Sequence, residues 1–283
     1  YDTGGVAGGI EMCSGLGACR KTLEGTMCPS YMATRDEQHS TRGRANVLRL
    51  TIAGKLGESG LGDKGVYESL DLCLECRACK AECPVGVDVA RFKSEFLADY
   101  WQRHGTSFEA RALGNVSTLA KWGSRFAPLS NWIAGSGPVR SLNEKLIGVD
   151  RRRQLPQFKR KTLRSLAPVE PGQPDALLFN DTFTNHYDPE IGLAAIRLMK
   201  RAGVRTALAA NHCCGRRQIS KGLLGTAHQK AERKTEALYE GAAAGRPLVF
   251  CEPSCLSAVR EDAPALLRGE SRRKAEKVAA PKA

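Results

Sequence analysis

The sequence lacks long apolar runs, a secretory leader and abundant aromatic residues. No hydrophobic stretch approaches the roughly 18 residues that a membrane-spanning helix needs, so we expect no bilayer crossing. The chain begins at Tyr1 without a charged and then apolar leader, which predicts no signal peptide and a start inside a longer polypeptide. Aromatic residues make up only 6% of the chain, too few to suggest stacking platforms for nucleic-acid bases.

Acidic residues are also the minority, with 30 Asp and Glu against 43 Lys and Arg and a net charge of +13. Most of the excess lies in two stretches, residues 151–164 and residues 271–283. Because the remainder is close to neutral, we expect no nucleic-acid partner. The two basic stretches are interpreted as a solvated linker and a tail, and contact with anionic lipid is left open.

Cysteine, in contrast, is abundant, and it is the informative residue type. The chain has 11 cysteines in three groups, at positions 13, 19 and 28, at 73, 76, 79 and 83, and at 213, 214, 251 and 255. An odd number, tight spacings and no visible leader argue against a disulfide scaffold. The pattern therefore predicts reduced thiolates that bind metal in a cytoplasmic protein.

Composition divides the chain into four parts. Residues 1–105 hold seven of the cysteines between helical patterns, and residues 106–173 form a cysteine-free helical connector and basic linker broken by glycine and proline. Residues 174–268 alternate strand and helix patterns, and residues 269–283 are expected to be a disordered basic tail.

The third part is predicted to be a partial α/β domain. Strands are expected at residues 176–179, 204–209 and 247–250, and helices at residues 189–202, 218–240 and 254–267. Strands that alternate with helices predict a parallel sheet. Three strands are few for a complete sheet of this kind, so the fold class is mainly α plus α/β with an incomplete second domain.

The strongest motif is CLECRACKAECP at residues 73–84, which matches C-x2-C-x2-C-x3-C-P. Thiolates two residues apart in a coiled loop can converge on a cubane cluster from several directions, and the loop amides can point at its sulfides. Zinc sites more often pair two C-x2-C units across a longer loop. The run therefore predicts a [4Fe–4S] cluster. Arg77 and Lys80, which alternate with the cysteines, either offset the cluster charge or are solvated.

The first cysteine group complements this run. In two-cluster proteins the fourth cysteine of such a run ligates the other cluster. An exchange of fourth ligands predicts one cluster held by Cys28, Cys73, Cys76 and Cys79. It predicts a second cluster with three visible ligands, Cys13, Cys19 and Cys83. Leu16 stands where a full run would have its second cysteine, so the second cluster is [4Fe–4S] with another ligand, [3Fe–4S] or absent, and Cys13 and Cys19 could be ordinary buried thiols.

Residues 27–45, 70–76 and 83–88 resemble the C-terminal iron–sulfur portion of bacterial FAD-linked D-2-hydroxyacid dehydrogenases and glycolate oxidase-type oxidoreductases. The resemblance implies an α-helical ferredoxin domain that transfers electrons from a flavin to an acceptor, either a quinone or a carrier protein. The flavin would oxidise D-lactate, glycolate, D-2-hydroxyglutarate or a similar acid. FAD is expected on a partner subunit or a missing N-terminal domain, because this chain has no recognisable flavin-binding domain and no catalytic residues of its own.

The segments HCCG at residues 212–215 and CEPSC at residues 251–255 resemble the cysteine-rich CCG domain of heterodisulfide reductases. That resemblance implies metal binding by Cys213, Cys214 and Cys255. The spacing C-x3-C and the single copy depart from the family pattern, so a partial site with buried cysteines is the alternative. His212 is interpreted as a loop residue.

The leading hypothesis is an iron–sulfur electron-transfer module of an oxidoreductase, located in the cytoplasm, with peripheral contact at the inner membrane face left open. A zinc-stabilised interaction or nucleic-acid-binding module is the alternative from another class. The third hypothesis is an inactive gene fragment, because the predicted α/β part is about half the size of a complete domain of this kind.

Overall fold

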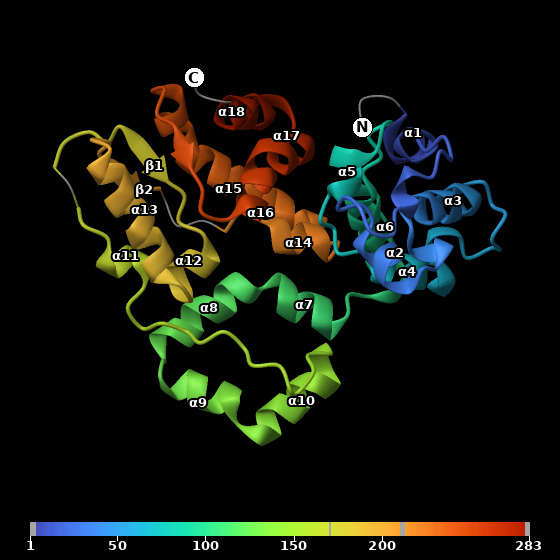
Figure 1. The fold of residues 1–283 in the computed structure, drawn as a ribbon, viewed down its shortest axis with the longest axis horizontal. Helices are drawn as coiled ribbons and strands as arrows, with labels where there is room; N and C mark the ends of the chain where they lie inside the picture. The colour runs from blue at the N-terminus through green and yellow to red at the C-terminus, as the bar shows by residue number, and fades with distance from the viewer. Residues whose placement is uncertain (1–3, 170, 210–212, 281–283) are drawn as a thin grey trace. The chain divides into compact units, whose positions relative to one another are not determined.

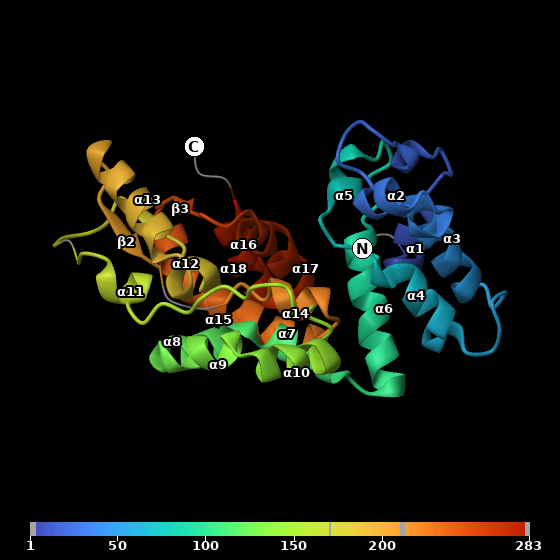
Figure 2. The same ribbon diagram turned by 60° about the horizontal axis from the view of Figure 1, so that its bottom comes forward.

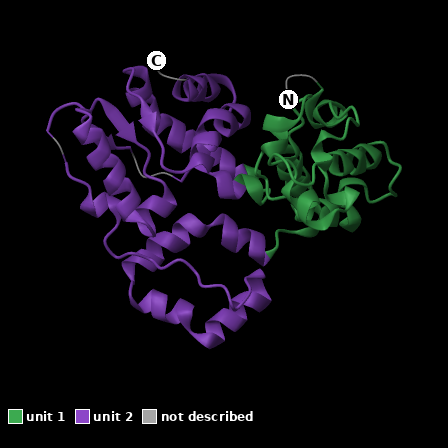
Figure 3. Ribbon diagram, in the orientation of Figure 1, with its two compact units in different colours: residues 1–107, 219–224 green, residues 108–218, 225–283 purple. Residues whose placement is uncertain are grey.

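The computed structural model describes residues 4–169, 171–209 and 213–280, and it divides into two compact units. Unit 1 contains the chain up to Ser107 together with the short segment Ile219–Leu224 (Figure 3). Unit 2 contains Phe108–Gln218 and Gly225 onward, so the connector and the α/β part lie in one unit. Within the described residues, no helix has the length and apolar character needed to cross a membrane.

Unit 1 is helical, and several of its helices begin at a side-chain cap. Ser40, Asp63 and Asp88 each accept a hydrogen bond from a backbone N–H in the first turn of the helix that follows. The elements, in chain order (Figure 1), are α1 (Gly5–Glu11), η1 (Ala18–Arg20), α2 (Pro29–Thr34), η2 (Glu37–His39), α3 (Thr41–Ile52), η3 (Gly60–Gly62), α4 (Lys64–Asp71), α5 (Ala78–Glu82) and α6 (Val89–His104).

The core of unit 1 is built around α6. Val89, Phe92 and Phe96 are buried on one face of this helix, as their helical spacing predicts. The segment Ile219–Leu224 completes the unit, since Trp101 Nε1 donates to the carbonyl of Lys221 at 2.8 Å. All the cysteines of the first two groups except the exposed Cys76 pack in this same core.

Unit 2 begins with short helices, α7 (Phe108–Gly114), α8 (Val116–Arg125), α9 (Leu129–Gly135) and α10 (Gly137–Ile147) (Figure 1, Figure 2). The basic stretch that follows is anchored to α9, because the Asn131 side chain donates to Phe158 O at 2.9 Å and accepts from Phe158 N at 2.8 Å. It ends at α11 (Leu163–Leu166).

The rest of unit 2 contains a three-stranded parallel sheet with the order β2-β1-β3, which confirms the predicted fold class. Leu178 of the central strand pairs with Leu208 and Val249. The elements are β1 (Ala176–Leu178), α12 (Thr182–His186), α13 (Pro189–Arg201), β2 (Thr206–Leu208), α14 (Arg216–Ser220), α15 (Leu224–Ala243), β3 (Leu248–Val249), α16 (Pro253–Ser257), the π-helical turn η4 (Ala258–Asp262), α17 (Ala263–Leu266) and α18 (Gly269–Ala279).

Two expectations differ from the structure. The helix predicted at residues 218–240 is interrupted between α14 and α15, where Gly222 has a φ of +68° that ends a regular helix. The tail predicted to be disordered forms α18 over Gly269–Ala279. Ala275 and Val278, three residues apart, are buried there, and Lys274 pairs with Glu236 at 2.8 Å. This apolar face is too small to stand out in a basic sequence.

Candidate functional site

Four cysteines from two distant segments line one cavity in unit 1. The cavity is partly open to solvent. Its lining includes Cys28, Cys73, Cys76 and Cys79, the set that the exchange of fourth ligands predicts for one cluster. Cys28 and Cys79 are buried, Cys73 is half-buried and Cys76 is exposed. The structure thus brings the four thiols together around a space, while their role as ligands stays a prediction.

The loop between Cys73 and Cys79 has an unusual backbone. Glu75 and Arg77 adopt left-handed φ values of 53° and 63°, a conformation that is uncommon for non-glycine residues. The N–H of Glu75 donates to the sulfur of Cys73, and the N–H of Val89 donates to the sulfur of Cys79. Alternating backbone conformations of this kind make concave anion sites from amide groups. The loop therefore suits a negatively charged occupant.

Two buried cations lie next to these thiols. Arg44 on α3 is 1% exposed, and its Nη1 donates to Cys28 Sγ at 3.5 Å while its Nε donates to Ser69 O at 3.0 Å. Lys93 on α6 donates from Nζ to the carbonyls of Asp71 and Cys73, both at 2.9 Å. A buried positive charge is costly without an anion nearby, and thiolates would supply that anion.

Two of the thiols, Cys73 and Cys79, are hard to ionise without metal. Burial raises the pKa of Cys79 to about 12, and burial also raises the pKa of Cys73, against the opposing charges of Arg44 and Lys93. Thiolate is the form that binds iron, so metal binding must displace these protons. The donor set fits an iron–sulfur cluster, because four thiols and the buried Arg44 line one cavity and backbone amides donate to two of the sulfurs.

Glu82, between the third and fourth cysteines of the run, joins the two cysteine groups. Its carboxylate accepts hydrogen bonds from Thr26 N at 2.6 Å, from Thr26 Oγ1 and from Met27 N at 3.2 Å. The hydrogen bonds from Thr26 are the main reason that the pKa of Glu82 is lowered to about 2. This clasp fixes the segment that leads into Cys28. We did not predict it, since the sequence gives only a glutamate at that place.

The second predicted ligand set lies elsewhere in the same core. Cys19 is buried in η1, where burial raises its pKa and its sulfur accepts from Arg42 N at 3.3 Å. Cys13 follows α1 and its carbonyl accepts from Arg49 Nη2 at 2.8 Å, while Cys83 follows α5. Leu16 is 68% exposed. No described contact joins the three sulfurs, so this set stays a prediction.

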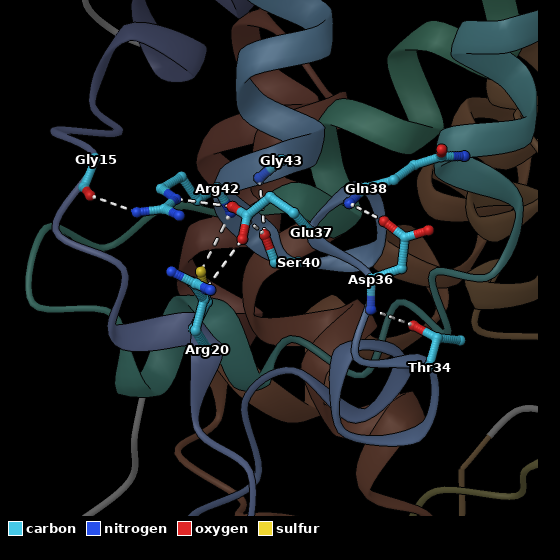
Figure 4. Close-up of polar contacts among 10 residues, drawn as sticks. Gly15, Arg20, Thr34, Asp36, Glu37, Gln38, Ser40, Arg42 and Gly43 are labelled. Carbon is cyan, nitrogen blue, oxygen red and sulfur yellow. Dashed lines mark hydrogen bonds and ion pairs between the residues drawn. The ribbon is translucent and has the colours of Figure 1, made fainter.

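The segment that carries Cys19 is held by charged residues (Figure 4). Glu37 forms an ion pair with Arg20, whose Nε lies 3.0 Å from Oε2, and accepts a hydrogen bond from Arg42 Nε at 2.8 Å. Arg42 Nη1 also donates to Gly15 O at 3.2 Å. The hydrogen bond from Arg42 is the main reason that the pKa of Glu37 is lowered. This clamp attaches the loop around Cys19 to the start of α3.

In unit 2, Cys214 and Cys255 come together. Their sulfurs are 3.1 Å apart and both residues are buried, next to Lys234, whose Nζ donates to Cys214 O at 2.9 Å. The neighbouring Cys213 thiol acts to lower the pKa of Cys214, but the hydrogen bond with Cys255 and burial outweigh it and raise that pKa to about 12.

Of the other cysteines in unit 2, Cys213 contacts this pair and Cys251 packs elsewhere. The hydrogen bond with Cys214 raises the pKa of Cys213, and burial adds to the effect. Cys251 packs in a different cluster, with Leu163, Leu178 and Ile196. His212 lies outside the described residues. Across the residues that the structure describes, no three His, Cys, Asp or Glu side chains converge as a single-ion site.

Comparison with known proteins identifies the class of unit 1. Residues 6–87 match the model of the 4Fe-4S dicluster domain, a match that includes all seven cysteines of the first two groups. This part of the chain is therefore a dicluster electron-transfer domain, and its class implies two iron–sulfur clusters.

The chain as a whole is homologous to the C-terminal part of D-2-hydroxyglutarate dehydrogenases. It is 27% identical to that protein from Escherichia coli K12, over 90% of this chain and 30% of the relative. It is 28% identical to one of the subunits of the anaerobic glycerol-3-phosphate dehydrogenase of E. coli K12, over 56% of this chain and 41% of the relative.

A shorter match, 38% identical over 24% of this chain and 15% of the relative, is to the probable glycolate oxidase iron–sulfur subunit of Bacillus subtilis 168. The chain thus spans about 30% of the length of the dehydrogenases that it resembles. No solved structure matches it.

Proposed function

We propose that this chain is the iron–sulfur electron-transfer module of an FAD-dependent D-2-hydroxyacid oxidoreductase. It would receive electrons from a flavin on a partner domain or subunit and deliver them to a quinone or a carrier protein. The observation that carries the proposal is the cavity lined by Cys28, Cys73, Cys76 and Cys79. The dicluster match and the dehydrogenase relatives support it.

In this proposal, the four cavity cysteines hold one [4Fe–4S] cluster. Cys13, Cys19 and Cys83 hold a second cluster, either [3Fe–4S] or [4Fe–4S] with a further ligand. When bound, these clusters supply one-electron redox chemistry at potentials that the protein sets. Ligation by Cys213, Cys214 and Cys255 would add a third centre.

The protein's own residues determine how such a centre behaves. The carbonyl contacts of Lys93 and the Glu82 clasp fix the backbone on either side of the cysteine run. The side chains of Val89 and Ala90 line the cavity and reduce its contact with water. A drier site with fixed donors favours the less charged state of a cluster, while each buried cation favours the reduced state.

The test is the metal content of the full chain purified without oxygen. We expect a brown protein that absorbs near 400 nm, with about seven or eight irons per chain and an equal amount of sulfide. An iron content of about four per chain would indicate a single cluster. A content above eight would indicate that unit 2 also binds metal. A colourless protein with stoichiometric zinc would contradict the proposal.

The dehydrogenase part of the proposal needs a second experiment. We expect that mixing the oxidised chain with its flavoprotein partner and a D-2-hydroxy acid bleaches the absorbance near 400 nm. The L-enantiomer of the same acid serves as the control. Equal bleaching by both enantiomers would contradict the assignment to D-2-hydroxyacid oxidation, while leaving the iron–sulfur assignment in place.

A further inference from the structure

One nitrogen of the Arg44 guanidinium group, Nη2, has no hydrogen-bond acceptor among the described residues. The side chain is 1% exposed and lines the cavity with the four cysteines. Two of its nitrogens have acceptors, Ser69 O for Nε and Cys28 Sγ for Nη1. Nη2 is buried and has no acceptor among the described residues. A buried donor left unpaired is unfavourable, so it points to an acceptor that occupies the cavity.

The charge of Arg44 leads to the same conclusion. No carboxylate of the described part of the chain forms an ion pair with it, although isolated buried charges are strongly unfavourable. Its positive charge acts to lower the pKa of Cys73, and its guanidinium group donates a hydrogen bond to Cys28. The other charged residues near the cysteines are placed differently. Lys93 donates to two backbone carbonyls, and Glu75 and Arg77 line the cavity from the loop of the cysteine run.

We propose that Arg44 is the built-in counter-ion of the cluster held by Cys28, Cys73, Cys76 and Cys79, and that its Nη2 donates a hydrogen bond to a cluster sulfide. This inference rests on the proposed function. A cluster with four thiolates has a net negative charge, and one-electron reduction adds another. Because Arg44 attracts the reduced form more strongly, it raises the reduction potential of this cluster. No bond to Arg44 forms or breaks, and no proton moves.

From the sequence pattern alone, Arg77 and Lys80 would be expected to offset the charge of the cluster. Arg77 and Lys80 alternate with the cysteines, but Lys80 is exposed, and charges in water are strongly screened. Arg44 lies on α3, 16 residues after Cys28 and in a different element from the cysteine run. It therefore links the two cysteine groups electrostatically at the cavity where they meet.

The experiment is a redox titration of the full chain, followed by EPR, in the wild type and in Arg44→Met. We expect the midpoint potential of one cluster to fall in Arg44→Met while the other stays unchanged. Lys64→Met removes a charge from a side chain that is 82% exposed, so this control should leave both potentials unchanged. Unchanged potentials in an Arg44→Met protein that retains its iron would overturn the inference.

A second measurement does not depend on the stability of that variant. Wild-type protein labelled with guanidino-15N arginine should show a 15N coupling at one reduced cluster by pulsed EPR. The coupling should persist in Arg77→Lys and disappear in Arg44→Lys. Absence of the coupling from the wild type would overturn the inference. A wild type without iron would instead contradict the proposed function, so the two failures are distinguishable.

Discussion

At the scale of single residues, Cys28 offers the sharpest test of the ligand exchange. It lines the cavity together with the three cysteines of the other group. We expect Cys28→Ser to lose about four irons per chain and one of the two EPR signals, because serine oxygen binds iron more weakly than thiolate. The matched control is Cys251→Ser, a half-buried cysteine outside this cavity, which should retain its iron. Equal iron in both variants would contradict the exchange.

Glu82 gives a prediction about acid. Its pKa is lowered from 4.5 to about 2, so its stabilising effect is complete above pH 4.5 and is lost as the pH falls toward 2. Glu82→Gln removes the charge and one acceptor from the clasp on Thr26 and Met27. We expect this variant to lose its cluster severalfold faster than the wild type above pH 4.5.

Stopped-flow pH jumps that follow the absorbance near 400 nm would measure those rates. The two proteins should converge as the final pH approaches 2, where Glu82 of the wild type is also protonated. A constant ratio of rates from pH 7 to pH 2 would show that the clasp does not act through the ionised carboxylate. Glu144→Gln, which affects an ion pair in unit 2, is the control.

The residues of the site divide into those that sequence spacing reveals and those that it does not. Cys73, Cys76 and Cys79 follow a local pattern, so their common cavity could be predicted. Arg44 and Glu82 act on residues 16 and 56 positions away, and nothing in their own neighbourhood shows that contact. Predicting them requires the packing of α3 and α5.

At the scale of elements, the junction between η2 and α3 depends on Gly43. A Cβ at this position would lie 2.0 Å from the backbone oxygen of Glu37. We expect Gly43→Ala to destabilise unit 1 by about 1–3 kcal/mol or more, because backbone on both sides must shift. Thermal unfolding followed by circular dichroism would measure it.

Gly225 in α15 is the control for that substitution, since a Cβ there meets nothing within 4 Å. Gly225→Ala should be neutral or stabilising by up to about 1 kcal/mol, as expected for alanine in place of glycine in a helix. A Gly43→Ala protein as stable as Gly225→Ala would show that η2 and α3 are not tightly packed.

The elements themselves were partly predictable. The strands of the sheet follow apolar runs bounded by helices, and their parallel pairing follows from that alternation. The break at Gly222 was missed because helical periodicity continues across it, and only its positive φ ends the helix. Helix α18 was missed because its two buried residues, Ala275 and Val278, form a minimal apolar face.

At the scale of the whole molecule, unit 1 depends on a segment from late in the chain. Trp101 donates to Lys221 O, and the Cα of Gly222 lies so close to Leu97 that a Cβ would be 2.4 Å from the Cβ of Leu97. We expect a fragment of residues 1–107 to be less stable than unit 1 of the full chain by about 1–3 kcal/mol.

Anaerobic urea titrations that follow the absorbance near 400 nm would compare the two proteins. The cluster of the fragment should be lost at a lower urea concentration than that of the full chain. Equal midpoints would show that the segment Ile219–Leu224 adds nothing to the stability of unit 1.

The late position of Ile219–Leu224 in the chain has a consequence for biosynthesis. Every cysteine of the dicluster domain leaves the ribosome well before Ile219–Leu224 is translated. At about 5–20 residues per second, the delay after residue 107 is on the order of ten seconds. During that interval the nascent domain lacks the contacts of Ile219–Leu224, so iron can be delivered before unit 1 is complete.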